Sequence, residues 1–233
     1  MPAPFLRRGI PCVVIACMSF FCCARTVRAA TIIKLDLGGT GPDVSMTSGV
    51  FGTVNDGNAG TTGDQNTAVE YTDFLDFIPD ITLPVASYTL SGLQEVGPAT
   101  VFGGSLVSQN FVGGQFSLYD PSNTLLLQGP LINSALTGTL GPPGTGAIFS
   151  TTLTGVTGGT LAPFIVPGSI SMSMEMTNVN GGAGFTIPGG SPFLGAFQAD
   201  ATTSISASPI PEPASLSLLL VAATPALLRR RTR

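Results

Sequence analysis

The chain has 233 residues, with 9 lysines and arginines against 13 aspartates and glutamates, no histidine and a net charge of −4. The lack of histidine excludes a Ser–His–Asp triad, a Cys–His pair and a histidine-based zinc site. Between residues 30 and 208, Lys34 stands alone against twelve carboxylates, which gives this stretch a net charge of −11. Because binding to phosphates needs clustered lysine and arginine, nucleic-acid binding is excluded.

Residues 1–29 have the layout of a secretory signal peptide. Arg7 and Arg8 supply a positively charged start, an apolar stretch covers residues 10–24, and small residues precede a cleavage site after Ala29. All four cysteines lie within residues 12–23, inside this leader. We therefore expect an exported chain that signal peptidase cuts, and a mature part without any disulfide.

Residues 30–208 are expected to form one secreted all-β domain, because glycine, proline, threonine and serine are abundant and charged residues are sparse. A long loop is expected over residues 49–66, where Gly, Asn, Asp and Thr dominate. The expected strands, in chain order, are residues 31–37, 67–78 (as a strand or a short helix), 81–93, 115–119, 124–128, 147–156, 170–177 and 199–207.

Two patterns in this domain are especially clear. Asp120 and Pro121 occupy the first two positions of a segment whose sequence suits a type I turn, so a hairpin is expected around residues 120–123. Between residues 170 and 177, Met172, Met174 and Met176 alternate with polar residues, which predicts a strand whose methionine face belongs to the core. Short strands between Gly/Pro clusters predict an antiparallel β-sandwich, a jelly-roll-like domain or a related barrel.

Two groups of oxygen-bearing side chains are candidates for chemistry. Asp56, Asn58 and Asp64 lie in the Gly-rich loop and offer oxygen ligands for Ca²⁺, the only cofactor that the sequence suggests. The second group begins at Glu70 and continues at positions 73, 76 and 80. Paired carboxylates can serve a glycosidase, although a solvated acidic face explains the same pattern.

Residues 209–233 combine three features in a fixed order. Pro211 and Pro213 flank Glu212 and favour an extended backbone, residues 214–228 carry no charge, and Arg229, Arg230 and Arg231 follow. The uncharged run has fifteen residues, fewer than the roughly 20 that span a hydrocarbon core, so this hydrophobic helix suits a transient anchor. The arginines stay in the cytoplasm, which places the Pro-Glu-Pro element on the outer face of the membrane.

This order resembles the PEP-CTERM sorting signal, the bacterial tail that exosortases recognise. Pro211, Glu212 and Pro213 match the tripeptide, residues 214–228 the membrane segment and Arg229–Arg231 the basic cluster, while Ile210 stands where valine is common. The resemblance covers about a tenth of the chain. It implies an exosortase-type processing enzyme as partner, attachment to the membrane through the tail, and a place in the bacterial envelope. A proline-rich linker before an ordinary anchor is the alternative.

Together these features predict a non-enzymatic protein of the cell surface or the extracellular polysaccharide matrix. Its expected parts are a signal peptide (1–29), a secreted all-β domain (30–208) and a sorting signal (209–233) with a membrane helix at 214–228. One alternative is a carbohydrate- or calcium-binding adhesin-like module. A more remote alternative is a carboxylate-based glycosidase.

Overall fold

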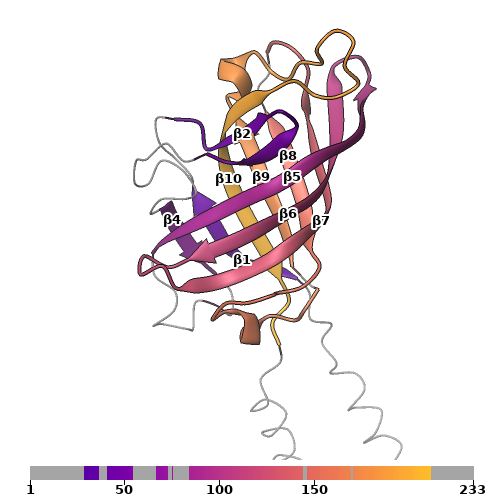
Figure 1. Ribbon diagram of the computed structural model, residues 1–233. Helices are drawn as coiled ribbons and strands as arrows, with labels where there is room; N and C mark the ends of the chain where they lie inside the picture. Colours follow the sequence, from indigo (N-terminus) through magenta and orange to yellow (C-terminus); the bar gives the residue numbers. More distant parts are fainter. Residues whose placement is uncertain are drawn as a thin grey trace, which may run out of the picture.

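A computed structural model describes residues 29–36, 41–54, 67–72, 75, 84–143, 146–168 and 170–210 of the chain. Ten strands in these ranges form one antiparallel sheet, which folds round until it closes nearly into a ring (Figure 1). Two short 3₁₀ helices, η3 (Ala162–Phe164) and η4 (Val179–Gly182), lie at opposite ends of the ring. The strands are β1 (Ala30–Asp36), β2 (Val44–Thr47), β3 (Val50–Thr53), β4 (Thr67–Tyr71), β5 (Val85–Phe102), β6 (Leu106–Tyr119), β7 (Leu125–Thr139), β8 (Ala147–Leu153), β9 (Ser171–Thr177) and β10 (Phe197–Ala207).

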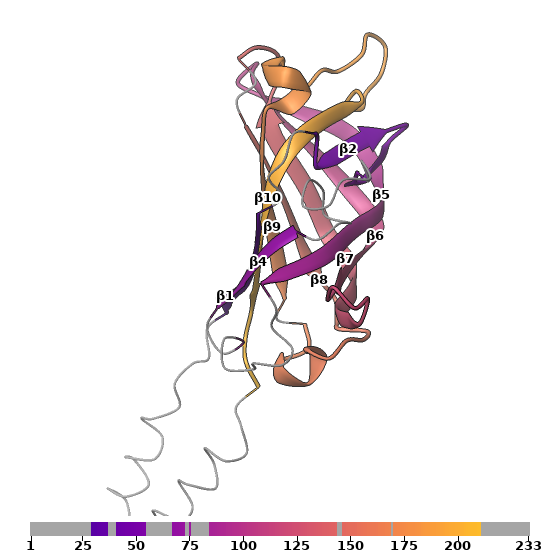
Figure 2. The ribbon, with the colours of Figure 1, turned by 90° about the vertical axis from the view of Figure 1, so that its left-hand side faces the viewer.

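The ring is continuous from β5 to β10, because each of these strands pairs with the next one along the chain. Two separate strand pairs close the ring between β10 and β5. One is β1 with β4 and the other is β2 with β3, and each links β10 to β5. Figure 2 shows β2 near the upper end of the molecule and β1 with β4 near the lower end.

A single buried carboxylate spans the gap between these two closing pairs. β10 pairs with β1 from Thr202 onward and with β2 up to Ala199, so it changes partner at the two residues between. Asp43, which directly precedes β2, is 2% exposed, and its Oδ2 accepts the N–H of Ala201 at 2.6 Å. The Asp43 N–H donates to the carbonyl of Ala199 at 3.0 Å. Asp43 therefore supplies a hydrogen-bond acceptor to β10 at Ala201, which pairs with neither β1 nor β2.

Side chains fill the inside of the ring. Met172, Met174 and Met176 of β9 are at most 1% exposed, as the alternation of residues 170–177 predicts. At the centre the Phe51 ring lies 5.0 Å from that of Phe149, between centroids, with further phenylalanines around it. Each fully buried apolar side chain of this kind contributes roughly 1.5–3 kcal/mol relative to exposure.

The expectation of an all-β antiparallel domain is confirmed, and so is the hairpin at residues 120–123. There the Asn123 N–H donates to the Asp120 carbonyl at 2.9 Å, and the Thr124 N–H donates to Asp120 Oδ1 at 2.7 Å. The loop expected from residue 49 is wrong in its first part, because residues 50–53 form β3. Ser48 and Gly49, with φ of 53° and 76°, make a two-residue turn that returns the chain from β2 into β3.

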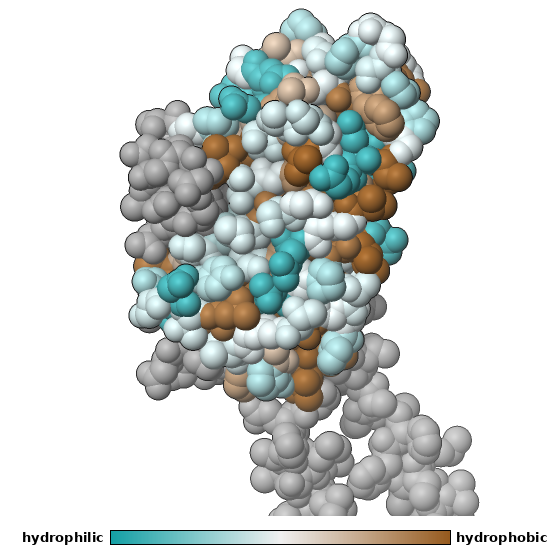
Figure 3. Space-filling model, in the orientation of Figure 1, coloured by the Kyte–Doolittle hydropathy of each residue, from teal (hydrophilic) through white to brown (hydrophobic). Residues whose placement is uncertain are grey.

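Exposed apolar side chains occur at several places on the outside of the ring, including the β5–β6 tip, where Phe102 lies opposite Leu106. On the face shown in Figure 3, the hydrophobic patches are separated by polar ones. Within the ranges that the structure describes, no helix has the length and apolar character needed to span a membrane. The large apolar residues that are exposed are Val50, Val96, Val101, Phe102, Leu106, Val112, Ile132, Ile148, Phe164 and Ile210.

Candidate functional site

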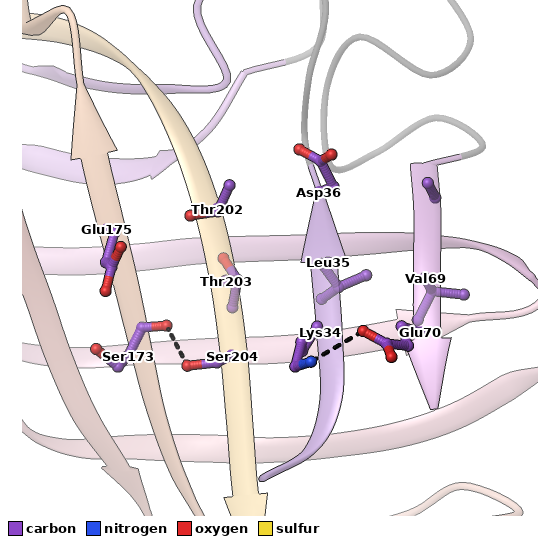
Figure 4. Close-up of a pocket in the computed structure, with 11 residues that line it drawn as sticks. Lys34, Leu35, Asp36, Val69, Glu70, Ser173, Glu175, Thr202, Thr203 and Ser204 are labelled. Atoms are coloured by element: carbon purple, nitrogen blue, oxygen red, sulfur yellow. Dashed lines mark hydrogen bonds and ion pairs between the residues drawn. The ribbon is translucent and has the colours of Figure 1, made fainter. Parts of the chain in front are cut away.

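The outer face of β9, β10, β1 and β4 is polar and hollowed. Successive side chains of a strand point to opposite faces, so each apolar residue that points into the ring is followed by one that points outward. On these four strands most of the outward residues carry a hydroxyl or a charge. They line a depression of about 420 Å³ (Figure 4). The polar lining residues that point outward are Lys34, Asp36, Glu70, Ser173, Glu175, Thr202 and Ser204.

The strand register sets these side chains in two rows across the sheet. In one row Thr202 lies between Glu175 and Asp36. In the other row Ser173, Ser204 and Lys34 follow one another, and Lys34 then lies opposite Glu70. The strands are spaced about 4.8 Å apart, so each row presents its functional groups at regular intervals.

Lys34 and Glu70 form an ion pair at one end of the depression. Lys34 Nζ donates to Glu70 Oε2 at 3.0 Å, and the two side chains are 54% and 64% exposed. Water screens a pair of this kind, so it contributes at most about 1 kcal/mol to stability. The ion pair holds an amine and a carboxylate in place beside the hydroxyls of Ser173 and Ser204.

A second depression of about 290 Å³ continues the surface across β8 towards β7. It shares Ser173 and Ser204 with the first depression. Of its lining residues, Ser206 places its Oγ 3.3 Å from Thr31 Oγ1, and Ser204 donates its Oγ–H to the Ser173 carbonyl at 3.4 Å. We call the combined surface the outer hydroxyl face; its residues are Ser150, Thr152, Ser171, Ser173, Thr202, Ser204 and Ser206.

The outer hydroxyl face can exchange many hydrogen bonds with a ligand rich in hydroxyl groups. Each serine or threonine hydroxyl both donates and accepts, while Asp36 and Glu175 only accept and Lys34 only donates. The three carboxylates of the first depression outnumber its single lysine, so the local field disfavours anionic polymers. The surface suits a neutral polyhydroxylated partner.

Two tyrosines carry shifted pKa values because of burial. Desolvation raises the pKa of Tyr71 to about 12, and the negative charge of Asp120 adds to this effect. Desolvation also raises the pKa of Tyr88 far above its ordinary value, although the hydrogen bond to Thr203 opposes the shift. The Tyr88 hydroxyl lies 3.2 Å from Thr203 Oγ1 inside the ring, where it links β5 to β10. This contact belongs to the core.

Most of the site residues predicted from the sequence lie outside the described residues. These are the calcium ligands Asp56, Asn58 and Asp64, and the sorting residues Pro211, Glu212, Pro213, Arg229, Arg230 and Arg231. Among the residues that are described, no group of three or more His, Cys, Asp or Glu side chains is placed to hold a metal ion. Ala29 is described, and it is exposed immediately before β1.

The acidic group is described only at Glu70, whose partner is Lys34. Positions 73, 76 and 80 are not among the described residues. The outer hydroxyl face was not predicted, because its members come from separate strands and only the register brings them together. The available signal was the polar half of the alternation in residues 171–177 and 202–206.

No protein-family model, no curated protein and no solved structure matches this chain. Its function is therefore inferred from its own residues and geometry.

Proposed function

We propose that this protein is an exported, non-enzymatic β-domain that a C-terminal sorting signal holds at the outer face of the membrane for an exosortase-type enzyme. The mature domain then belongs to the cell surface or to the extracellular polysaccharide matrix of a bacterial envelope. Pro211, Glu212 and Pro213 are the residues that the enzyme reads, and Arg229–Arg231 hold the far end of the tail in the cytoplasm.

The observation that carries this proposal is that the two ends of the domain lie side by side. Ala30 of β1 lies opposite Ala207 of β10. Opposite residues of an antiparallel pair have their Cα atoms about 4.5–5.5 Å apart. Residues 29–30 and 207–210 therefore lie at the same end of the ring (Figures 1 and 2), which lets a single membrane hold both the predicted leader and the predicted tail.

Charge is consistent with this placement. The arginines from Arg229 onward follow the apolar run of the tail, and basic residues flanking a membrane segment remain in the cytoplasm, so the tail would cross in a way that leaves the domain outside. The leader has two arginines on each side of its apolar stretch, Arg7 and Arg8 before it and Arg25 and Arg28 after it, so charge alone does not orient the leader. Because the two ends of the domain are adjacent, the folded domain can stay outside the membrane while its terminal segments are inserted.

The junction between domain and tail also suits processing. β10 ends at Ala207, and the last contacts of the described chain are made by Pro209 and Ile210. Pro211 is the next residue, so a cut within residues 211–213 removes none of the ten strands. The domain keeps its fold when the tail is lost.

A double variant of the tripeptide tests this proposal. We expect Pro211→Ala with Glu212→Ala to leave the chain uncut in the membrane fraction of its native host, whereas the wild-type domain loses its arginines. Ile210→Val, which places valine before the tripeptide, is the matched control and should be processed normally. Normal processing of the double variant would exclude the sorting role of the tripeptide.

A second candidate function is the binding of a neutral polysaccharide by the outer hydroxyl face. The supporting observation is the continuous array of outward hydroxyls over three strands, β8, β9 and β10, beside three exposed carboxylates. Glycan-array binding without turnover would support it. Thr202→Val, which replaces one hydroxyl by a methyl group, should weaken binding, whereas Ser122→Ala in the exposed β6–β7 turn should not. Equal binding by both variants would exclude this face as the site.

A further inference from the structure

We infer that the end of the ring formed by residues 162–167 and 208–210 rests on the lipid headgroup layer while the tail anchors the protein, with Phe164 and Ile210 in contact with lipid. We call this surface the basal end. The inference rests on the proposed function, because it requires the tail to be inserted in the membrane.

The chain is held firmly to the domain up to the residue before the sorting tripeptide. The Val166 N–H donates to the Ser208 carbonyl at 2.9 Å, and the Ile210 N–H donates to the Phe164 carbonyl at 3.0 Å. Between these bonds Ile165 and Pro209 form an antiparallel bridge, and the Ile165 side chain is fully buried. No free linker therefore separates the folded domain from Pro211.

The short tail brings this fixed point close to the membrane. Four residues lead from Ile210 to Ala214, the first residue of the uncharged run, and a fully extended chain covers at most about 14 Å over that length. A fifteen-residue helix is about 22 Å long, roughly 8 Å shorter than the 30 Å hydrocarbon core. A stretch this short is accommodated by local thinning of the bilayer, so Ala214 lies at the outer boundary of the hydrocarbon and Glu212 stays outside it.

The reach of these four residues is only a little more than the thickness of the headgroup layer. All of the roughly 14 Å of extended chain lies outside the hydrocarbon. The polar layer of one leaflet is about 5–8 Å thick, half the difference between the full bilayer and its core. Even the most extended path therefore keeps Ile210 within about 6–9 Å of the headgroup layer, and a less extended path places it among the headgroups.

The chemistry of the basal end suits that position. Phe164 is 38% exposed and Ile210 is 41% exposed, and Pro163 and Pro167 beside them are exposed as well. None of these side chains carries a charge, so contact with lipid removes apolar surface from water without desolvating an ion. The nearby β6–β7 turn carries Asp120, which gives no preference for anionic lipids. The lipid partner is therefore a zwitterionic surface.

This orientation places the opposite end of the ring farthest from the membrane. The β5–β6 hairpin tip, where Phe102 pairs with Leu106, projects at the end of the ring opposite η3 (Figure 1). Phe102 is 53% exposed, so it is as accessible as the residues of the basal end and serves as their control.

The inference is tested by attaching one fluorescent label at a time and measuring its quenching by a nitroxide carried on the lipid. The chain from residue 30 to 233 contains no cysteine, so Phe164→Cys, Ile210→Cys and Phe102→Cys each give one labelling site. The leaderless full chain would be purified from a host without a processing enzyme and reconstituted into phosphatidylcholine vesicles that carry a nitroxide quencher. Retention after a carbonate wash reports separately whether the tail is inserted.

We expect the fluorescence of labels at positions 164 and 210 to be lost in vesicles with the quencher, and that of the label at 102 to be unchanged. If the protein resists the carbonate wash but the labels at 164 and 210 are not quenched, the basal contact is refuted and the anchoring proposal stands. If the wash removes the protein, the tail is not inserted and both proposals fall.

Discussion

Replacing Asp43 should destabilise the domain more than replacing any exposed carboxylate. In the structure, Asp43 Oδ2 accepts the Ala201 N–H at 2.6 Å, at the point where β10 changes partner from β1 to β2. Asp43→Ala removes this acceptor and leaves the Ala201 N–H buried without it. Asp43→Asn keeps an oxygen of similar position but removes the negative charge that strengthens the bond.

The expected magnitude follows from the burial of both groups. Asp43 is 2% exposed and Ala201 5%. Hydrogen bonds to charged groups contribute about 1.5–3 kcal/mol, and a buried donor left without a partner costs about 1–3 kcal/mol. We therefore expect Asp43→Ala to lower the free energy of unfolding by about 2–3 kcal/mol, and Asp43→Asn by about 1 kcal/mol.

Urea unfolding of the purified protein, followed by circular dichroism, measures both effects. With an m-value of 1–3 kcal/mol/M, a loss of 2 kcal/mol moves the midpoint by about 1 M. Asp36→Asn is the matched control, because Asp36 is an exposed carboxylate on neighbouring β1 and its replacement should change stability by less than about 0.5 kcal/mol. Equal midpoints for Asp43→Ala and Asp36→Asn would refute the assigned role of Asp43.

Three further predictions concern the core. Met174→Ala, at a fully buried position of β9, should lower the free energy of unfolding by about 2–5 kcal/mol, and a midpoint within experimental error of wild type would contradict the packing of that face. Tyr88→Phe removes the contact with Thr203 and should cost about 1 kcal/mol in the same urea assay; a more stable variant would show that the contact is unfavourable. Since burial raises the pKa of Tyr71 from 10.0 to about 12, the folded protein holds this proton more tightly than the unfolded chain. That stabilisation is complete below pH 10 and is lost as the pH rises towards 12, so an ultraviolet titration should show this tyrosine ionising late, and ionisation at its ordinary pKa would contradict its burial.

The parts of the fold that sequence reasoning predicted are those whose cause is local. The alternation that ends in Met176 and the turn that begins at Asp120 each need only neighbouring residues, and both are present in the structure. β3 was missed because it follows a two-residue turn at Ser48–Gly49 in a stretch whose later glycines suggested a loop. One of its two partners, β2, directly precedes it, but the other, β5, lies about forty residues further along the chain, where no local pattern predicts the pairing.

The closure of the ring and the outer hydroxyl face were beyond sequence reasoning for a related reason. Closure depends on which strands meet β10, and the buried role of Asp43 exists only because two different strands share that edge. Ser173 and Ser204 come together through register alone, although each alternation was visible in the sequence. By contrast, the sorting tail was readable at once, because its order of tripeptide, apolar run and arginines is contained in one continuous segment.

The mass of the C-terminal peptide tests the central proposal most directly. It would be determined by mass spectrometry for the protein isolated from the membrane fraction and from the medium of the native host. A sorting signal predicts a terminus at or near Pro211–Pro213, with the arginines removed. A terminus at Arg233 in all of the membrane-bound protein, with none in the medium, would show an ordinary anchor and contradict the proposal.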